Sequence, residues 1–121
     1  MMGKIKKTYK EIYGEINEIA EHYGYYPQSR QLIEEMAELT VAINKEWRLM
    51  NEDADDGEIK DARMHIAEEM ADVQIMILQI SHLLKCGAHM NEIMVEKLDR
   101  QISRIREKEW HVHKRGRFKA E

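Results

Sequence analysis

The feature that most constrains this fold is the helical spacing of apolar residues along nearly the whole chain. Apolar side chains recur about every three to four residues, which is the periodicity of one face of an α-helix. The 121-residue chain has one proline to interrupt this pattern, and no stretch of any length alternates as a β-strand does. We therefore expect an all-α protein with helices over residues 4–22, 27–51, 58–85 and 90–110.

The breaks between these helices have their own signals. Pro27 fits the first turn of the second helix, and Ser29 is a candidate for its N-cap. The segment NEDADDG, residues 51–57, is expected to be an acidic loop in contact with solvent. Gly87 can take the left-handed conformation that ends the third helix. Residues 111–121 are expected to form an irregular basic tail.

Length and composition favour one cytoplasmic domain. A chain of 121 residues suits a single modest core, which we assign to residues 1–110. Cys86 is the one cysteine, so an intrachain disulfide is ruled out and a reducing cytoplasm is expected. The N-terminal lysines precede no apolar run, which argues against a signal peptide. Residues 73–84 are too short and too polar to span a membrane.

Charge is distributed unevenly along the chain. The net charge of −4 argues against general nucleic-acid binding. Residues 97–121 nevertheless hold nine Lys or Arg and four acids, a local charge of +5. The remaining residues therefore carry −9, so an acidic body is combined with a basic C-terminal segment.

Two acidic segments of this body are closely alike. Residues 32–39 and 65–73 both contain Glu-Glu-Met-Ala, 34 residues apart, and each continues to a third acid. The repeat reflects either a duplication or convergence on one requirement. The acids are Glu34, Glu35 and Glu38 in the first segment, and Glu68, Glu69 and Asp72 in the second.

A helical projection places both clusters against apolar residues. On the second helix the acids lie beside the predicted core face, made of Leu32, Met36, Leu39, Ile43 and Trp47. On the third helix they lie between two apolar stripes, one with Ile66, Met70, Val73, Ile77, Ile80 and Leu84, the other with Met64, Ala71, Ile75 and Leu78. A helix with two apolar faces must bury both, so we expect one face within the subunit and one against another subunit.

Such acids most simply form a solvated face paired with basic residues, but cations are scarce here. Arg30 is the one Lys or Arg within four positions of the first cluster, and residues 64–76 contain no Lys or Arg. Carboxylates gathered in a cleft repel one another unless a cation joins them. Hard oxygen ligands suit Mg²⁺, with Mn²⁺ as a substitute. The Glu-x-x-His pairs of di-iron bundles are absent, and His65, within the acidic arc, is a candidate to support a ligand rather than to be one.

A basic stripe on the fourth helix complements this prediction. Protein-bound Mg²⁺ usually meets substrate phosphates, which in turn need cationic partners. The stripe consists of Lys97, Arg100, Gln101, Arg104 and Lys108. The alternative is an ordinary solvated face with ion pairs along the helix, such as Glu96 with Arg100. Gly-rich phosphate loops are absent from the sequence.

These residues resemble a known enzyme family. EEMAE followed by EMAD matches the Glu-Glu-x-x-Glu and Glu-x-x-Asp signature of the MazG-like all-α NTP pyrophosphatases. The flanking blocks HYGYYPQSRQLIEEMAELTVAINKEWR, IAEEMADVQIMILQI and VEKLDRQISRI are similar, in that order, to a phage-type branch, and cover most of residues 22–105. The resemblance implies a four-helix up-and-down bundle-like fold whose helices are swapped or packed across a dimer, assembled as a homodimer or homotetramer.

The resemblance also implies an activity and a set of site residues. Members hydrolyse nucleoside triphosphates between the α and β phosphates with Mg²⁺, releasing monophosphate and pyrophosphate, in cleansing of the nucleotide pool. By motif position, the implied metal ligands are Glu35, Glu38, Glu69 and Asp72. The implied substrate contacts are Lys97, Gln101 and Arg104.

Two departures and two open roles accompany the resemblance. Gln101 stands where the family often has Asn, and the connection from Glu38 to Glu69 is longer than in the commonest members. Glu34 or Glu68 is a candidate to orient or deprotonate the attacking water, and solvent exposure is the alternative for both. A protein of another class would also fit the sequence, namely a catalytically silent helical dimer that binds a nucleotide or a protein partner. RNA binding through the basic tail has weaker support, because short charged runs are usually solvated.

Overall fold

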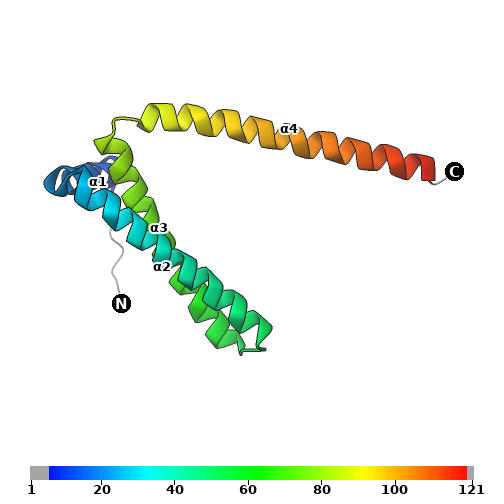
Figure 1. Ribbon diagram of the computed structural model, residues 1–121, viewed down its shortest axis with the longest axis horizontal. Coiled ribbons are helices and arrows are strands. Elements are labelled where there is room, and N and C mark those ends of the chain that lie inside the picture. The colour runs from blue at the N-terminus through cyan, green and yellow to red at the C-terminus, as the bar shows by residue number, and fades with distance from the viewer. Residues whose placement is uncertain (1–5, 120–121) are drawn as a thin grey trace. The chain divides into compact units, whose positions relative to one another are not determined.

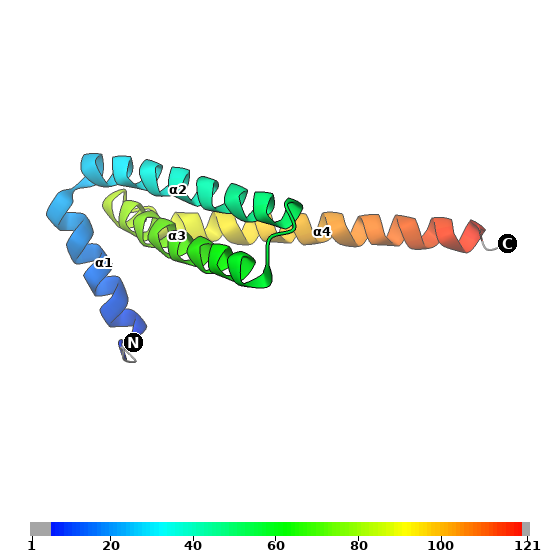
Figure 2. The same ribbon diagram turned by 90° about the horizontal axis from the view of Figure 1, so that it is seen from below.

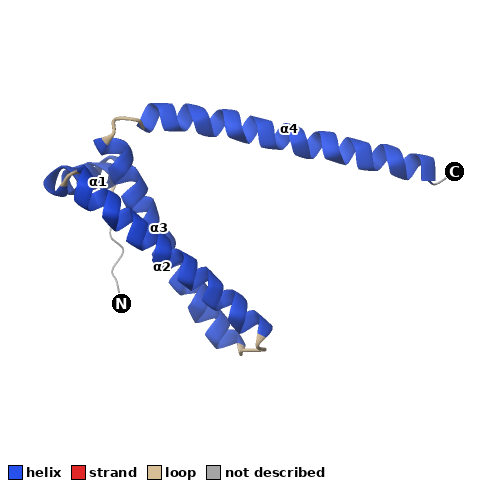
Figure 3. Cartoon of the chain, viewed as in Figure 1, coloured by secondary structure: helices blue, strands red, loops and turns tan. Residues whose placement is uncertain are grey.

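The structure, a computed structural model, describes residues 6–119, with the side chains of residues 111 and 113–119 outside that description. Every regular element within it is an α-helix, and short loops connect the helices (Figure 3). The expectation of an all-α protein is thus confirmed over the described residues. The elements are α1 (Tyr9–Tyr23), α2 (Tyr25–Asn51), α3 (Asp56–Leu83) and α4 (Gly87–Lys119).

Side-chain caps fix the first turns of α1 and α3. The Thr8 hydroxyl accepts a hydrogen bond of 3.1 Å from the Glu11 backbone N–H, and Asp55 Oδ1 accepts one of 2.8 Å from the Glu58 N–H. Each cap satisfies a donor that the helix itself cannot. The Asp55 cap lies in the acidic segment NEDADDG, so the predicted loop is shorter than expected and α3 begins at Asp56.

Further helix boundaries differ from the sequence prediction. α2 follows Gly24, whose φ of 85° favours glycine, and the predicted cap Ser29 lies inside the helix, where its hydroxyl donates to the Tyr26 carbonyl. Lys85, with φ of 55°, takes the left-handed position after α3, and Gly87 instead begins α4. The backbone of α4 continues past residue 110 to Lys119, so the predicted irregular tail is helical over most of its length.

The chain divides into two compact units, Met1–Lys85 and Cys86–Glu121. In the first unit, α2 and α3 run side by side in opposite directions, and α1 packs mainly on α3 (Figures 1 and 2). The tight connection through residues 52–55 favours this antiparallel hairpin. The second unit consists of α4. The assignment of one domain to residues 1–110 stays a prediction.

The contact between α2 and α3 follows a heptad-like spacing. Its positions alternate steps of three and four residues, as in a coiled-coil seam. All of them are buried or half-buried, and we call them the seam. They are Gln28, Leu32, Glu35, Leu39, Ala42, Glu46 and Leu49 on α2, and Ile59, Ala62, Ile66, Glu69, Val73, Met76, Ile80 and Leu83 on α3. The seam therefore places two Glu residues of the acidic segments between the helices.

The predicted core face of α2 is partly wrong. Met36, Ile43 and Trp47 are 43%, 48% and 65% exposed, while Leu32 and Leu39 do lie on the seam. Two helices can approach closely where one of them has a small residue, and α2 packs on α3 through the face that contains Ala42. The sequence prediction instead chose the face with the largest apolar side chains. The unit therefore exposes an apolar strip along α2, consisting of Ile33, Met36, Ile43, Trp47 and Met50.

Helix α4 carries large apolar side chains at helical spacing. Val95, Leu98, Ile102 and Ile105 all fall on one side of this helix, as the sequence predicts, and all are exposed. Across residues 6–119, no helix is both long enough and apolar enough to cross a bilayer.

Candidate metal centre

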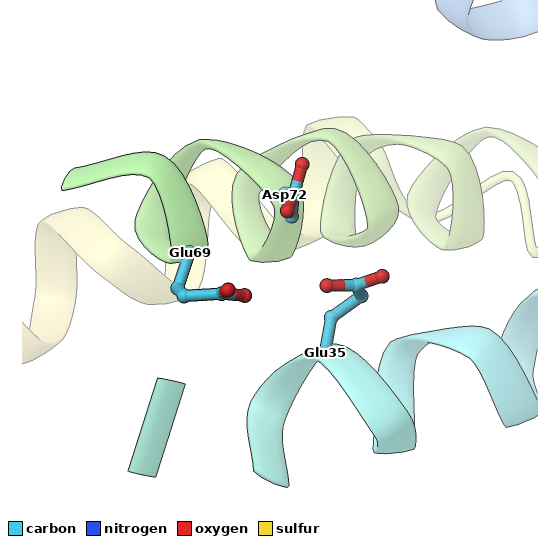
Figure 4. Close-up of side chains that lie close together, drawn as sticks. All are labelled: Glu35, Glu69 and Asp72. Carbon is cyan, nitrogen blue, oxygen red and sulfur yellow. The ribbon is translucent and has the colours of Figure 1, made fainter. Parts of the chain in front are cut away.

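Two seam residues bring carboxylates together near the middle of the hairpin. Glu35 on α2 and Glu69 on α3 reach toward each other, and Asp72 lies along α3 beside them (Figure 4). One carboxylate oxygen from each of these three residues lies within 4.8 Å of the other two. Both Glu residues occupy positions where a coiled-coil seam ordinarily has an apolar side chain.

The hydrogen bonds of these two Glu residues follow the same pattern. Gln31 Nε2 donates to Glu35 Oε1 at 2.8 Å, and His65 Nε2 lies 3.1 Å from Glu69 Oε1. The second oxygens, Glu35 Oε2 and Glu69 Oε2, are buried and have no hydrogen-bond partner among the described residues. We call these two atoms the inner oxygens. A buried polar atom without a partner is costly, which indicates a missing ligand or water.

The negative charges of Glu35 and Glu69 help to raise the pKa values of two neighbouring carboxylates. The pKa of Glu38 is raised, chiefly because the negative charge of Glu35, and then that of Glu69, disfavours its ionisation. The pKa of Asp72 is raised first by burial and then by the charges of Glu35, Glu69 and Glu68. Glu35, Glu38, Glu69 and Asp72 therefore form one electrostatic cluster, which we call the four-carboxylate cluster.

No basic side chain neutralises this cluster within the described part of the chain. Lys7 pairs with Glu15 and Arg63 pairs with Glu46, and neither pair includes a member of the cluster. Among the side chains that the structure describes, His65, which carries charge when protonated, is the one base in an ion-pair contact with a member of the cluster. An added divalent cation would relieve the repulsion and satisfy the inner oxygens together. The donor set, all carboxylate oxygen, fits a hard cation such as Mg²⁺.

A surface groove adjoins the cluster. It has a volume of about 440 Å³ and is lined by Ala37, Glu38, Val41, His65 and Glu69. A second groove, of about 310 Å³, shares His65 and is lined further by Lys45, Glu58, Asp61 and Ala62. The first groove combines apolar and acidic walls, so a ligand held by a cation at the cluster would have space beside α2 and α3.

The structure places the predicted residues in three groups. Glu35, Glu38, Glu69 and Asp72, the residues implied as metal ligands, lie together in the four-carboxylate cluster. Glu34 and Glu68 are exposed, and of these two the charge of Glu68 acts on Asp72. Their suggested role in orienting water stays a prediction.

The third group belongs to α4. Lys97, Gln101 and Arg104 are exposed there at spacings of four and three residues, which place their side chains on one side of the helix. The structure therefore confirms that these three residues share a face. Their predicted contact with phosphate or sugar is untested and stays a prediction.

The sequence prediction missed Gln31 and a second polar pair. Gln31 is the donor to Glu35, and the 34-residue repeat relates it to His65, a signal that was available in the sequence. Gln28 Nε2 donates to Gln79 Oε1 at 2.7 Å, and both side chains are buried. Only the paired helices reveal that contact, because 51 residues separate its two partners.

Comparison of the chain with models of known families, with curated proteins and with solved structures finds no match in any of the three. The functional assignment therefore depends on the chemistry of the four-carboxylate cluster and its surroundings.

Proposed function

We propose that this protein is a Mg²⁺-dependent nucleoside triphosphate pyrophosphohydrolase. It would cleave a nucleoside or deoxynucleoside triphosphate between the α and β phosphates, releasing monophosphate and pyrophosphate. The single observation that carries the proposal is the pair of inner oxygens on facing seam positions of α2 and α3. Buried carboxylates that repel each other are a poor way to hold a hairpin together, so a ligand is the better reason for their presence.

Glu35, Glu38, Glu69 and Asp72 would hold the cation, with Mn²⁺ able to replace Mg²⁺. Three of them already bring an oxygen within 4.8 Å of one another, and Glu38 is coupled to two of these three. When bound, Mg²⁺ supplies positive charge that offsets phosphate charge and makes water a stronger nucleophile at neutral pH. Proteins usually leave part of the Mg²⁺ coordination to water and substrate phosphate, which suits a cluster that borders an open groove.

The remaining residues have narrower proposed roles. Glu68, whose charge acts on Asp72, would orient or deprotonate the attacking water, with Glu34 as the alternative. Lys97 and Arg104 on α4 would hold phosphate charge, and Gln101 would contact phosphate or sugar. The charges of Lys97 and Arg104 have the sign that a triphosphate requires.

We propose a homodimeric or homotetrameric cytoplasmic assembly with a MazG-like four-helix bundle. The exposed apolar strip on α2 supports association, because contiguous apolar surface of this kind usually marks an interface. The apolar side of α4 supports it as well. Sedimentation of the purified protein would give its oligomeric state directly, and a monomer at all concentrations would contradict this part of the proposal.

The activity is tested by phosphorus NMR of the full chain with a panel of nucleoside triphosphates. We expect monophosphate and pyrophosphate to appear with Mg²⁺ and to disappear when EDTA is added. Orthophosphate and diphosphate as products would mean that a different bond is cleaved. Absence of turnover for every nucleotide, with Mg²⁺ binding shown separately, would favour a silent nucleotide- or protein-binding module.

A further inference from the structure

The two halves of the cluster are related by the 34-residue repeat. Glu35 corresponds to Glu69, and Glu38 corresponds to Asp72. Because α2 and α3 are antiparallel, a repeat of this length brings one corresponding pair, Glu35 and Glu69, face to face across the seam (Figure 4). The repeat therefore builds a site with two similar halves, one from each helix.

Each half contains a donor one turn before the seam Glu. Gln31 donates to Glu35 Oε1 at 2.8 Å, and His65 makes the corresponding contact of 3.1 Å with Glu69 Oε1. An ionised carboxylate only accepts hydrogen bonds, so His65 Nε2 is the donor when Glu69 is ionised. In both halves the donor binds one carboxylate oxygen, which we call the outer oxygen, and the inner oxygen is buried without a partner among the described residues.

The two donor contacts differ from two other His–Glu contacts in the burial of the carboxylate, since the Glu21 side chain that His82 contacts is 68% exposed. His89 and Glu92 lie 4.0 Å apart with side chains 74% and 77% exposed, as expected for an incidental surface contact. Glu69 is only 12% exposed, and Gln31 and Glu35 are both half-buried. A hydrogen bond to a half-buried carboxylate restricts its rotamers, whereas an exposed contact exchanges readily with water.

We propose that Gln31 and His65 are a pair of positioning residues for the metal ligands Glu35 and Glu69. They act through these ligands by holding each outer oxygen, so that the inner oxygens stay aimed at the position of the cation. This inference rests on the proposed metal site. Loss of such a supporting partner typically weakens metal binding by about 10–100-fold.

The test is Mn²⁺ binding to the full chain without nucleotide, measured by electron paramagnetic resonance of free Mn²⁺. We expect Gln31→Leu and His65→Leu each to weaken Mn²⁺ binding by about tenfold or more. His65→Gln places in α3 the same donor that Gln31 provides in α2. The Mn²⁺ affinity of His65→Gln should therefore stay within about threefold of the wild-type affinity. That change is smaller than the loss expected when a supporting partner is removed.

His82→Leu is the matched control. His82 lies on α3 and contacts Glu21 Oε1 at 2.9 Å, so it forms a similar His–Glu pair away from the cluster. We expect its removal to leave Mn²⁺ binding unchanged. Thermal unfolding followed by circular dichroism confirms that each variant is folded before its binding is compared.

The outcomes separate this inference from the proposed activity. Mn²⁺ binding by His65→Leu equal to the wild type, or equal weakening by His65→Gln and His65→Leu, would overturn the positioning role. Failure of the wild type to bind Mn²⁺ would overturn it as well. The expected variant pattern combined with no nucleotide hydrolysis would support the positioning role and contradict the pyrophosphohydrolase activity.

Discussion

The hairpin of α2 and α3 contains two polar pairs that differ in charge and in hydrogen bonding. Gln28 and Gln79 share a hydrogen bond of 2.7 Å, and both side chains are buried. Glu35 and Glu69 lie on the same two helices, nearer the connecting loop, yet their inner oxygens have no partner among the described residues. The first pair is neutral and complete, whereas the second is charged and incomplete.

This difference separates a structural polar contact from a candidate binding site. A satisfied buried pair helps to specify how two helices align, because a shifted alignment would separate its partners. An incomplete, like-charged pair destabilises the same hairpin in the absence of a ligand. The Gln pair therefore belongs to the fold, and the Glu pair is the candidate for a role in ligand binding.

The largest expected effect is on turnover. Glu69→Gln keeps the size of the side chain but removes a charge from the four-carboxylate cluster. We expect nucleotide hydrolysis to fall by more than about a hundredfold, beyond the usual effect of losing a supporting residue. The control is Glu46→Gln, since Glu46 is also a half-buried seam residue but is paired with Arg63 at 2.9 Å. An equal loss of nucleotide hydrolysis in Glu69→Gln and Glu46→Gln would contradict a specific role for Glu69.

Removing a carboxylate of the cluster should lower turnover but raise the stability of the metal-free protein. Glu35→Leu removes an inner oxygen and places an apolar side chain at an interior position of the seam. In EDTA, we expect the free energy of unfolding to rise by about 1–3 kcal/mol, the usual cost of a buried polar group without a partner. Urea unfolding measures this change. A loss of stability in EDTA would show that Glu35 supports the metal-free fold.

The same substitution in the neutral pair should destabilise the protein. Gln28→Leu leaves the buried Gln79 carbonyl oxygen without its donor, so we expect the free energy of unfolding to fall by about 1–3 kcal/mol. The double variant Gln28→Leu/Gln79→Leu should recover much of this loss, because both polar groups are then removed. Additive losses in the double variant would contradict the account of a self-satisfied pair.

The smallest effect concerns pH. In the metal-free protein the pKa values of Glu38 and Asp72 are raised above their ordinary values of 4.5 and 3.8. The folded state therefore binds protons more tightly than the unfolded state, and stability declines as pH rises from these ordinary values through the raised ones. Thermal melts in EDTA should show a steeper decline for the wild type than for Glu38→Gln/Asp72→Asn.

In saturating Mg²⁺, ionisation of Glu38 and Asp72 should instead increase stability as pH rises, because the cation binds the ionised carboxylates. Melts of the same two proteins in Mg²⁺ complete the comparison. Identical pH dependence of wild type and variant in EDTA would show that the two groups titrate normally in the folded protein.

Much of the fold could be predicted from local sequence. The four helices follow from apolar spacing and scarce breakers, and the acidic segments were found because they share Glu-Glu-Met-Ala. The grouping of Glu35, Glu69 and Asp72 was anticipated from the resemblance and is present in the structure. The helix ends were less predictable, since Lys85 takes a conformation that the sequence suggested for Gly87.

The alignment of the helices was the part that local sequence did not reveal. Met36 and Trp47 are more apolar than Ala42, yet Ala42 is buried and the other two are exposed. Helix packing depends on which ridges fit together, and a small residue at the contact allows closer approach. The donor role of Gln31 was missed although the contact lies within one helix, because nothing in the sequence singled out Glu35 as a partly buried side chain.

The sequence by itself determined that the chain is helical and that two similar acidic segments occur on successive helices. These properties arise from backbone preferences and side-chain spacing within about two turns. Only the tertiary structure decided that Glu35 and Glu69 lie in the seam of α2 and α3, and that the inner oxygen of each is buried. Burial depends on which faces two helices present to each other, and that choice involves residues far apart in the chain.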